Sequence, residues 1–106
     1  MNVARFDIYA NPYAEDRSHT PFVLDVQNDH LGPMGSRVVI PLRTAKGFGP
    51  SASGLNPSLA VEGKPVVLDT ASIASVNAVL LKKVVARADG HRLEIADALD
   101  TLFGSY

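Results

Sequence analysis

Cysteine is absent from the sequence, so disulfide bonds, cysteine-bound zinc and thiol catalysis are excluded. Long hydrophobic runs are absent too, because no stretch approaches the roughly 18 apolar residues that a membrane-spanning helix requires. The opening segment Met1–Asp7 lacks the apolar run of a signal peptide. These absences predict a cytoplasmic protein without a membrane partner.

The sequence also lacks a large excess of positive or negative charge. The formal net charge is -1 and the pI is about 6.2, whereas binding to duplex DNA relies on clustered lysine and arginine. We interpret the one short basic cluster, Lys82, Lys83 and Arg87, as a solvated face. The chain does have 46% hydrophobic and 20% charged residues in a length of 106, which is typical of a single globular domain over residues 1–106.

Hydrophobic and polar residues alternate in several short segments, with the period of a half-buried β-strand. The expected strands cover residues 4–9, 22–27, 37–42 and 76–81, and a hairpin joins 59–61 to 66–68. The strands at 22–27 and 37–42 are close in sequence and are expected to pair antiparallel. Residues 43–57 are rich in glycine, serine and proline, so this long connection is expected to be either mobile or functional.

Towards the end of the sequence the hydrophobic period becomes helical. The apolar stripe consists of Ile95, Leu99, Leu102 and Phe103. Asp89 is a candidate cap for the start of this helix, and Gly104 lies where a helix commonly ends. The pattern predicts a mainly β (α+β) fold, an antiparallel β-barrel or strongly twisted sheet with the C-terminal helix packed on it.

Side chains that carry catalysis are few and scattered. The three histidines, none of which is spaced to share a metal with another, are His19, His30 and His91. Asp25, Asp29 and Asp69 are interpreted as solvated strand ends rather than acid–base pairs. The sequence has neither a nucleophile-elbow serine nor a phosphate-binding glycine loop. We therefore expect no metal, no cofactor and no enzymatic activity.

Two consecutive expected strands carry a more specific pattern. Phe22–Asp29 reads FVLDVQND, and after a Pro/Gly turn Ser36–Leu42 reads SRVVIPL. These segments resemble the CcdB toxin family, in which a D-V-Q-S/N-D run precedes an R-x-V-I-P-L strand. The step Ala74–Val76 and the helix Ile95–Phe103 are similar to the family in position and pattern. The resemblance therefore covers nearly the whole chain.

The resemblance implies an SH3-like antiparallel β-barrel with a small side hairpin and one C-terminal α-helix. It implies a homodimeric toxin of a type II toxin–antitoxin system, which binds the DNA gyrase A subunit and traps the enzyme on cleaved DNA. The second implied partner is a CcdA-like antitoxin, which wraps the toxin with a disordered segment. Toxin and antitoxin together repress their own operon, and operator DNA is contacted only through the antitoxin.

The resemblance also implies gyrase contacts at the end of the helix and in the turn after the second strand. The matching positions are His30, Leu31, Asp100, Phe103, Gly104, Ser105 and Tyr106. The family has a tryptophan where this chain has Gly104, and that tryptophan resembles a cation–π anchor. Either Tyr106 supplies the aromatic face from a shifted place, or the toxin is weak or differently targeted. Phe103 is equally consistent with a contact and with a core residue that closes the stripe.

Two alternatives stay open from the sequence. MazF-like endoribonuclease toxins share the barrel, and Arg37 or Arg43 are candidate cations for that activity. The chain lacks the opening strand of those toxins, which contains glycine and aspartate. The second alternative is a toxin remnant that binds antitoxin but no longer poisons gyrase, and the missing tryptophan is consistent with it.

Overall fold

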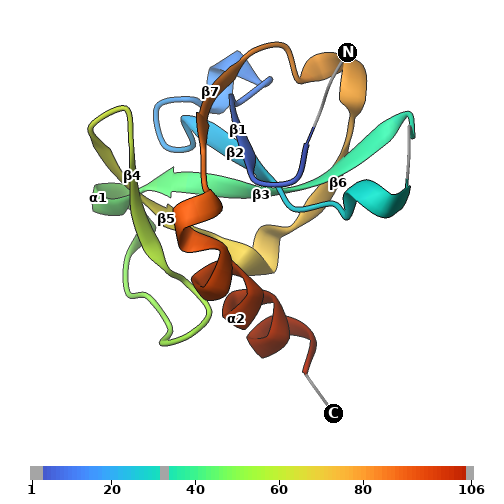
Figure 1. Ribbon diagram of the computed structural model, residues 1–106. Helices are drawn as coiled ribbons and strands as arrows, with labels where there is room; N and C mark the ends of the chain where they lie inside the picture. Colours follow the sequence, from blue (N-terminus) through green and yellow to red (C-terminus); the bar gives the residue numbers. More distant parts are fainter. Residues whose placement is uncertain (1–3, 32–33, 105–106) are drawn as a thin grey trace.

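A computed structural model describes residues 4–31 and 34–104 of the chain. In this part, seven strands form an antiparallel sheet that curls into a half-barrel, and a helix follows them (Figure 1). The strands are β1 (Asp7–Ala10), β2 (Phe22–Asp25), β3 (Ser36–Thr44), β4 (Ser58–Val61), β5 (Lys64–Leu68), β6 (Ala74–Asn77) and β7 (Val84–Arg87). The helices are α1 (Ala45–Phe48) and α2 (Arg92–Phe103), with 3₁₀ turns η1 (Ala14–Asp16), η2 (Asp29–Leu31), η3 (Thr70–Ser72), η4 (Ala78–Leu80) and η5 (Asp89–His91).

The long strand β3 organises the sheet, whose order is β4-β5-β3-β2-β1-β7 with β6 also paired to β3. Along one edge of β3, Ser36–Val39 pair with β6 and Leu42–Thr44 pair with β5. Pro41 marks the change of partner, because proline has no N–H to donate to the ladder. Its carbonyl oxygen instead accepts the N–H of Asp69 at 3.0 Å. The predicted antiparallel pairing of the second and third strands is confirmed by the β2–β3 ladder.

The main hydrophobic core lies between one face of the sheet and α2. Ile8, Leu24 and Ile40 contribute alternate positions of β1, β2 and β3, and none is more than 1% exposed. Ile95 and Ala98 of α2 complete this core and are fully buried. The residues of a smaller buried cluster on the opposite face are Tyr9, Val23, Val39 and Leu81. The predicted alternation along the first three strands is therefore confirmed.

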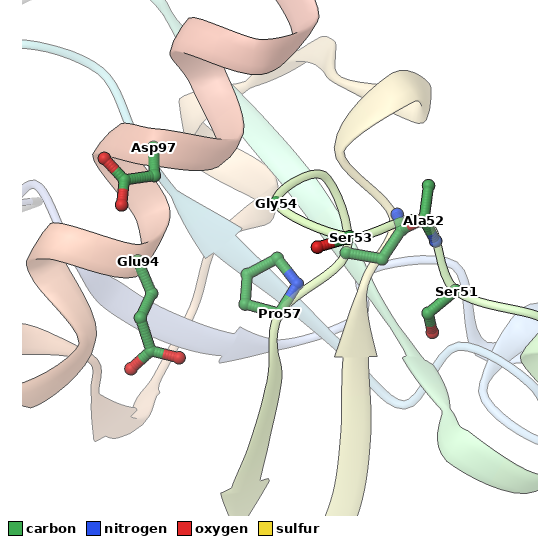
Figure 2. A pocket seen from close by; sticks show the side chains of 8 residues that line it. Ser51, Ala52, Ser53, Gly54, Pro57, Glu94 and Asp97 are labelled. Carbon is green, nitrogen blue, oxygen red and sulfur yellow. The ribbon is translucent and has the colours of Figure 1, made fainter.

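The connection predicted at residues 43–57 is partly regular structure, because β3 continues to Thr44 and α1 follows it directly. The second half of this segment lies against α2 (Figure 2). A Cβ atom on Gly54 would lie 3.4 Å from the Thr101 hydroxyl oxygen, so loop and helix approach closely. The hollow of about 390 Å³ between them is lined by Ser51, Ala52, Ser53, Gly54, Asn56, Pro57, Glu94 and Asp97.

The prediction of a strand over residues 76–81 is wrong over most of that segment. β6 ends at Asn77, whose side-chain oxygen accepts the N–H of Val79 at 3.1 Å and so begins the 3₁₀ turn η4. The chain then forms β7, which the sequence did not predict because its residues do not alternate and follow two lysines. β7 pairs with β1 and extends the sheet at that edge.

The prediction that Asp89 caps the helix is also wrong. Asp89 opens the 3₁₀ turn η5, and α2 begins only at Arg92 with no side-chain cap on its first turn. The Asp89 carboxylate instead accepts hydrogen bonds from Arg87 at 2.7 and 3.0 Å. The predicted end of the helix at Gly104 is confirmed, since this residue has φ +78° and follows the last helical turn.

Neither helix in the described segments has the length and hydrophobicity that crossing a bilayer demands.

Candidate partner-binding surface

Helix α2 presents its C-terminal end to solvent. Ile95 and Ala98 anchor the helix on the core, whereas Phe103 in the last turn is 69% exposed. The interpretation of Phe103 as a core residue is therefore wrong, and its interpretation as a contact stays a prediction. Asp100, one turn earlier, is also exposed. Gly104 closes the helix by donating its N–H to the Asp100 carbonyl at 2.7 Å.

The other predicted contacts lie elsewhere or outside the described residues. Leu31 is the last residue of η2, and its side chain is 60% exposed. The backbone of His30 belongs to the same turn, but its side chain lies outside the described atoms, as do Ser105 and Tyr106 entirely. The turn η2 and the end of α2 are separated in space (Figure 1). One chain therefore offers two separate groups of predicted contacts.

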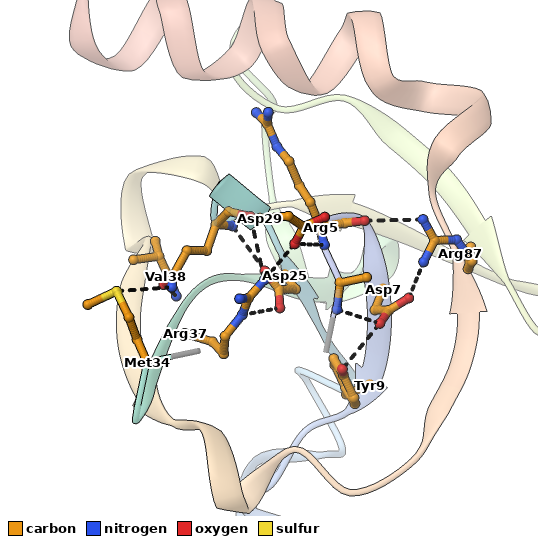
Figure 3. A network of polar contacts seen from close by, with 11 residues as sticks. Arg5, Asp7, Tyr9, Asp25, Asp29, Met34, Arg37, Val38 and Arg87 are labelled. Atoms are coloured by element: carbon orange, nitrogen blue, oxygen red, sulfur yellow. Dashed lines mark hydrogen bonds and ion pairs between the residues drawn. The ribbon is translucent and has the colours of Figure 1, made fainter. Parts of the chain in front are cut away.

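A network of ion pairs holds η2 on the sheet (Figure 3). Arg37 of β3 donates to both carboxylate oxygens of Asp25, at 2.7 and 2.9 Å. The same guanidinium lies 3.4 Å from Oδ1 of Asp29, the first residue of η2. That oxygen also accepts the backbone N–H of Arg5 at 3.0 Å. Asp29 thereby links the turn that carries Leu31 to β3 and to the segment before β1.

Asp25 is not the solvated strand end that the sequence predicts, because its side chain is completely buried. Burial raises the pKa of Asp25, while hydrogen bonds from Arg37 and from the N–H of Gln27 at 3.0 Å act in the opposite direction. The β2–β3 register places Asp25 opposite Val39, so Arg37 is its diagonal neighbour on the same face. Pairing the two predicted strands in this register would have revealed the ion pair.

A second branch of the network joins Asp7, Tyr9 and Arg87 where β1 meets β7 (Figure 3). The Tyr9 hydroxyl donates to the Asp7 carboxylate at 3.3 Å, and Arg87 donates to the other oxygen of Asp7. Burial, together with the charges of Asp7 and Asp25, raises the pKa of Tyr9 to about 12. Hydrogen bonding to Asp89 raises the pKa of Arg87 and lowers that of Asp89. Arg87 therefore combines these ion pairs with a side chain that is 46% exposed, in line with its interpretation as part of a solvated face.

The candidate catalytic groups are engaged in internal contacts. Arg37 is buried against Asp25, and Arg43 donates to Asp69 at 2.8 Å and to the Thr20 hydroxyl at 2.6 Å. Asp69 is accordingly a second aspartate that is paired rather than solvated, with a side chain only 15% exposed. Across residues 4–31 and 34–104, no three histidine, aspartate or glutamate side chains are grouped to hold a metal ion.

The two histidines whose side chains are described each have a neighbour of their own. The His19 ring lies 2.7 Å from the Thr20 hydroxyl, and the His91 ring lies 3.0 Å from a carboxylate oxygen of Glu94. His19 is exposed and His91 is partly exposed, in line with their interpretation as surface residues.

Comparison with protein families identifies the family to which the chain belongs. The family model described as "CcdB protein" matches residues 5–104. The chain belongs to the CcdB family. The matched residues include the β2–β3 pair, the turn η2 and the whole of α2. As a CcdB-family protein, the chain is a toxin of a toxin–antitoxin pair. A search of curated proteins finds no match to the chain.

Proposed function

We propose that this CcdB-family toxin binds the DNA gyrase A subunit and holds the enzyme on cleaved DNA, by protein binding rather than catalysis. The observation that carries the proposal is Phe103, an aromatic side chain left 69% exposed in the last turn of α2. Binding energy in protein interfaces concentrates in a few such anchors, each worth about 2 kcal/mol or more. A helix fixed on the core presents the anchor with little loss of conformational entropy on binding.

The contact surface comprises two groups of residues. The helix end contributes Asp100, Phe103, Gly104, Ser105 and Tyr106, and the turn contributes His30 and Leu31. Gly104 stands where the family has tryptophan, so Phe103 supplies the apolar anchor and Tyr106 adds an aromatic ring from a shifted place. The exposure of Leu31 and Phe103 supports both groups.

The proposed active form is a homodimer. A two-fold dimer presents the helix end and η2 twice in symmetric positions, which suits a target assembled from two gyrase A subunits. Doubling the contacts also raises avidity without any new kind of interaction. This form offers one way in which a small toxin without the family tryptophan retains affinity.

Neutralisation and regulation complete the proposal. A CcdA-like antitoxin covers the toxin in the cytoplasm, and the pair represses its own operon, with the antitoxin contacting operator DNA. The net charge of -1 supports this division of labour, since the toxin has no general excess of cations for phosphate binding.

The decisive experiment mixes the purified protein with gyrase, supercoiled plasmid and ATP, and separately with RNA. Accumulation of linear plasmid after denaturation is the expected result. Cut RNA would instead support the MazF-like ribonuclease, and Arg37→Ala and Arg43→Ala would then identify the cation responsible. Intact plasmid together with intact RNA would contradict the proposal and leave the toxin remnant.

A further inference from the structure

A hollow of about 300 Å³ lies between the loop that follows β1 and the segment that leads into β7. Its lining residues are Ala10, Pro12, Arg17, Leu80, Lys82, Lys83 and Val85. The elements that bound it lie at the opposite end of the molecule from the C-terminal end of α2 (Figure 1). The hollow is therefore separate from the helix-end group of the proposed gyrase contact.

The hollow gathers cations that the rest of the protein does not neutralise. Lys82 and Lys83 are exposed and have no ion-pair partner within the described part of the chain, and no carboxylate lines the hollow. Arg17 is fixed at the rim because its Nε donates to the Asn11 carbonyl at 2.6 Å. By contrast, the arginines with carboxylate partners are Arg37, Arg43 and Arg87. Three cations without carboxylate partners thus lie together on a chain whose net charge is -1.

The walls between these cations are apolar. Pro12, Leu80 and Val85 are partly buried and leave room for one side chain of moderate size. Single-stranded nucleic acid needs aromatic platforms on which its bases stack, and none of the described residues that line the hollow is aromatic. Apolar walls with a cationic rim instead complement an acidic peptide that carries an apolar side chain.

We propose that this hollow binds an acidic peptide segment, with an apolar side chain inserted beside Leu80 and Val85 and carboxylates placed against Lys82 and Lys83. The assignment of that segment to the antitoxin rests on the proposed function, because the antitoxin is the partner expected to wrap the toxin with a disordered chain. Such chains bind through several short anchors of this type.

A third hollow, which is lined by residues of α1 and the start of β5, provides a matched control. It has a volume of about 600 Å³, and its lysines are Lys46 and Lys64. The Lys64 ammonium already lies 5.8 Å from the centre of the Phe22 ring, so part of its interaction is satisfied internally. Reversing two lysines there changes the net charge by the same amount as reversing Lys82 and Lys83.

The test measures binding of a fluorescein-labelled peptide, GEELEDFEEG, by fluorescence anisotropy at 50 mM and 150 mM salt. We expect Lys82→Glu/Lys83→Glu to weaken binding by about tenfold, and Lys46→Glu/Lys64→Glu to change it by less than about twofold. The neutral peptide GQQLQNFQQG and the peptide GEESEDSEEG without apolar residues should both bind about tenfold more weakly than the parent. Thermal unfolding of each variant checks that the fold is intact.

Several results would overturn the inference. The first is an unchanged peptide affinity of the Lys82→Glu/Lys83→Glu variant, and the second is an equal or larger loss of peptide affinity in the control variant. The third is equal binding of the neutral and the acidic peptide, and the fourth is tighter binding of a 20-nucleotide single strand than of the acidic peptide.

Assignment of the peptide segment to the antitoxin is tested with the protein encoded beside the toxin gene. The Lys82→Glu/Lys83→Glu variant should need about tenfold more of it for neutralisation in the gyrase assay, and an unchanged requirement would contradict the assignment. Failure of the gyrase proposal is distinguishable, because it appears as absent cleavage by the unaltered protein.

Discussion

At the residue scale, the buried ion pair of Asp25 and Arg37 bears on whether Arg37 could act as a catalytic cation. Removing one member of a buried ion pair leaves an unpaired charge and typically costs about 3–5 kcal/mol. Arg37 therefore has a structural role in joining β2, β3 and η2, and it is poorly placed to act on RNA. Arg43 has its own partners in Asp69 and Thr20. The geometry consequently gives no support to catalysis by either arginine.

Tyr9 provides a pH-dependent prediction. Its pKa in the folded state is about 12, against about 10 for an unperturbed tyrosine. Because the folded pKa is raised, the stability that Tyr9 contributes is fully present below pH 10 and is lost between about pH 10 and pH 12. The loss amounts to at most about 2–3 kcal/mol. Absorbance at 295 nm should show one tyrosine that ionises late, and Tyr9→Phe should remove this component.

Tyr13 is the control for this titration, because it is exposed and Tyr13→Phe removes a different phenol. The late component should persist in that variant. Complete ionisation of all tyrosines near pH 10 in the folded protein would show that Tyr9 is not shielded as described.

At the scale of elements, the β4–β5 hairpin contains a strained residue. Glu62 has φ +52° and is followed by Gly63 with φ +77°, the combination that favours asparagine followed by glycine. Glu62→Asn should therefore stabilise the protein by about 0.5–1 kcal/mol and raise the Tm by several degrees. Gly63→Ala, which forces a side chain into the same region, should lower the Tm. A lower Tm for Glu62→Asn would contradict this account of the turn.

The turn η2 gives a prediction about positioning. Asp29→Ala removes both the contact with Arg37 and the acceptor for the Arg5 N–H. Asp29 is largely exposed, so we expect a change in unfolding free energy of about 0.5 kcal/mol or less. Hydrogen exchange at the Leu31 amide, which donates to the Asn28 carbonyl at 3.2 Å, should accelerate, and gyrase affinity should fall several-fold.

Asp16→Ala in the exposed turn η1 is the matched control, since it removes the same group from another 3₁₀ turn. It should leave both Leu31 exchange and gyrase affinity unchanged. If Asp29→Ala weakened gyrase binding without faster exchange at Leu31, Asp29 would be a direct contact rather than a positioning residue.

At the scale of the whole molecule, much of the fold followed from periodicity. Alternation in β1, β2 and β3 predicted which side chains enter the core, and the helical stripe predicted the buried Ile95. What sequence reasoning missed depended on contacts between distant segments. β7 is a strand because it pairs with β1, and Asp25 is buried because Arg37 neutralises it across the β2–β3 ladder. Asn77 ended β6 through a local side-chain bond that competes with the ladder.

The candidate site was predictable only in part. The position of Phe103 followed from the resemblance to the family, but its exposure depends on where α2 rests on the sheet. The hollow at Lys82 and Lys83 combines the loop after β1 with the segment before β7, so no local pattern predicts it. The end of α2 and the hollow at Lys82 and Lys83 lie at opposite ends of the molecule (Figure 1).

Affinity for the gyrase A subunit tests the central claim most directly. Calorimetric titration would compare the unaltered toxin with Phe103→Ala and with Val79→Ala, which truncates an exposed side chain of the turn η4. The account predicts a loss of about thirtyfold or more for Phe103→Ala, with an unchanged Tm, and no loss for Val79→Ala. Equal affinity of the Phe103→Ala variant and the unaltered toxin would contradict it.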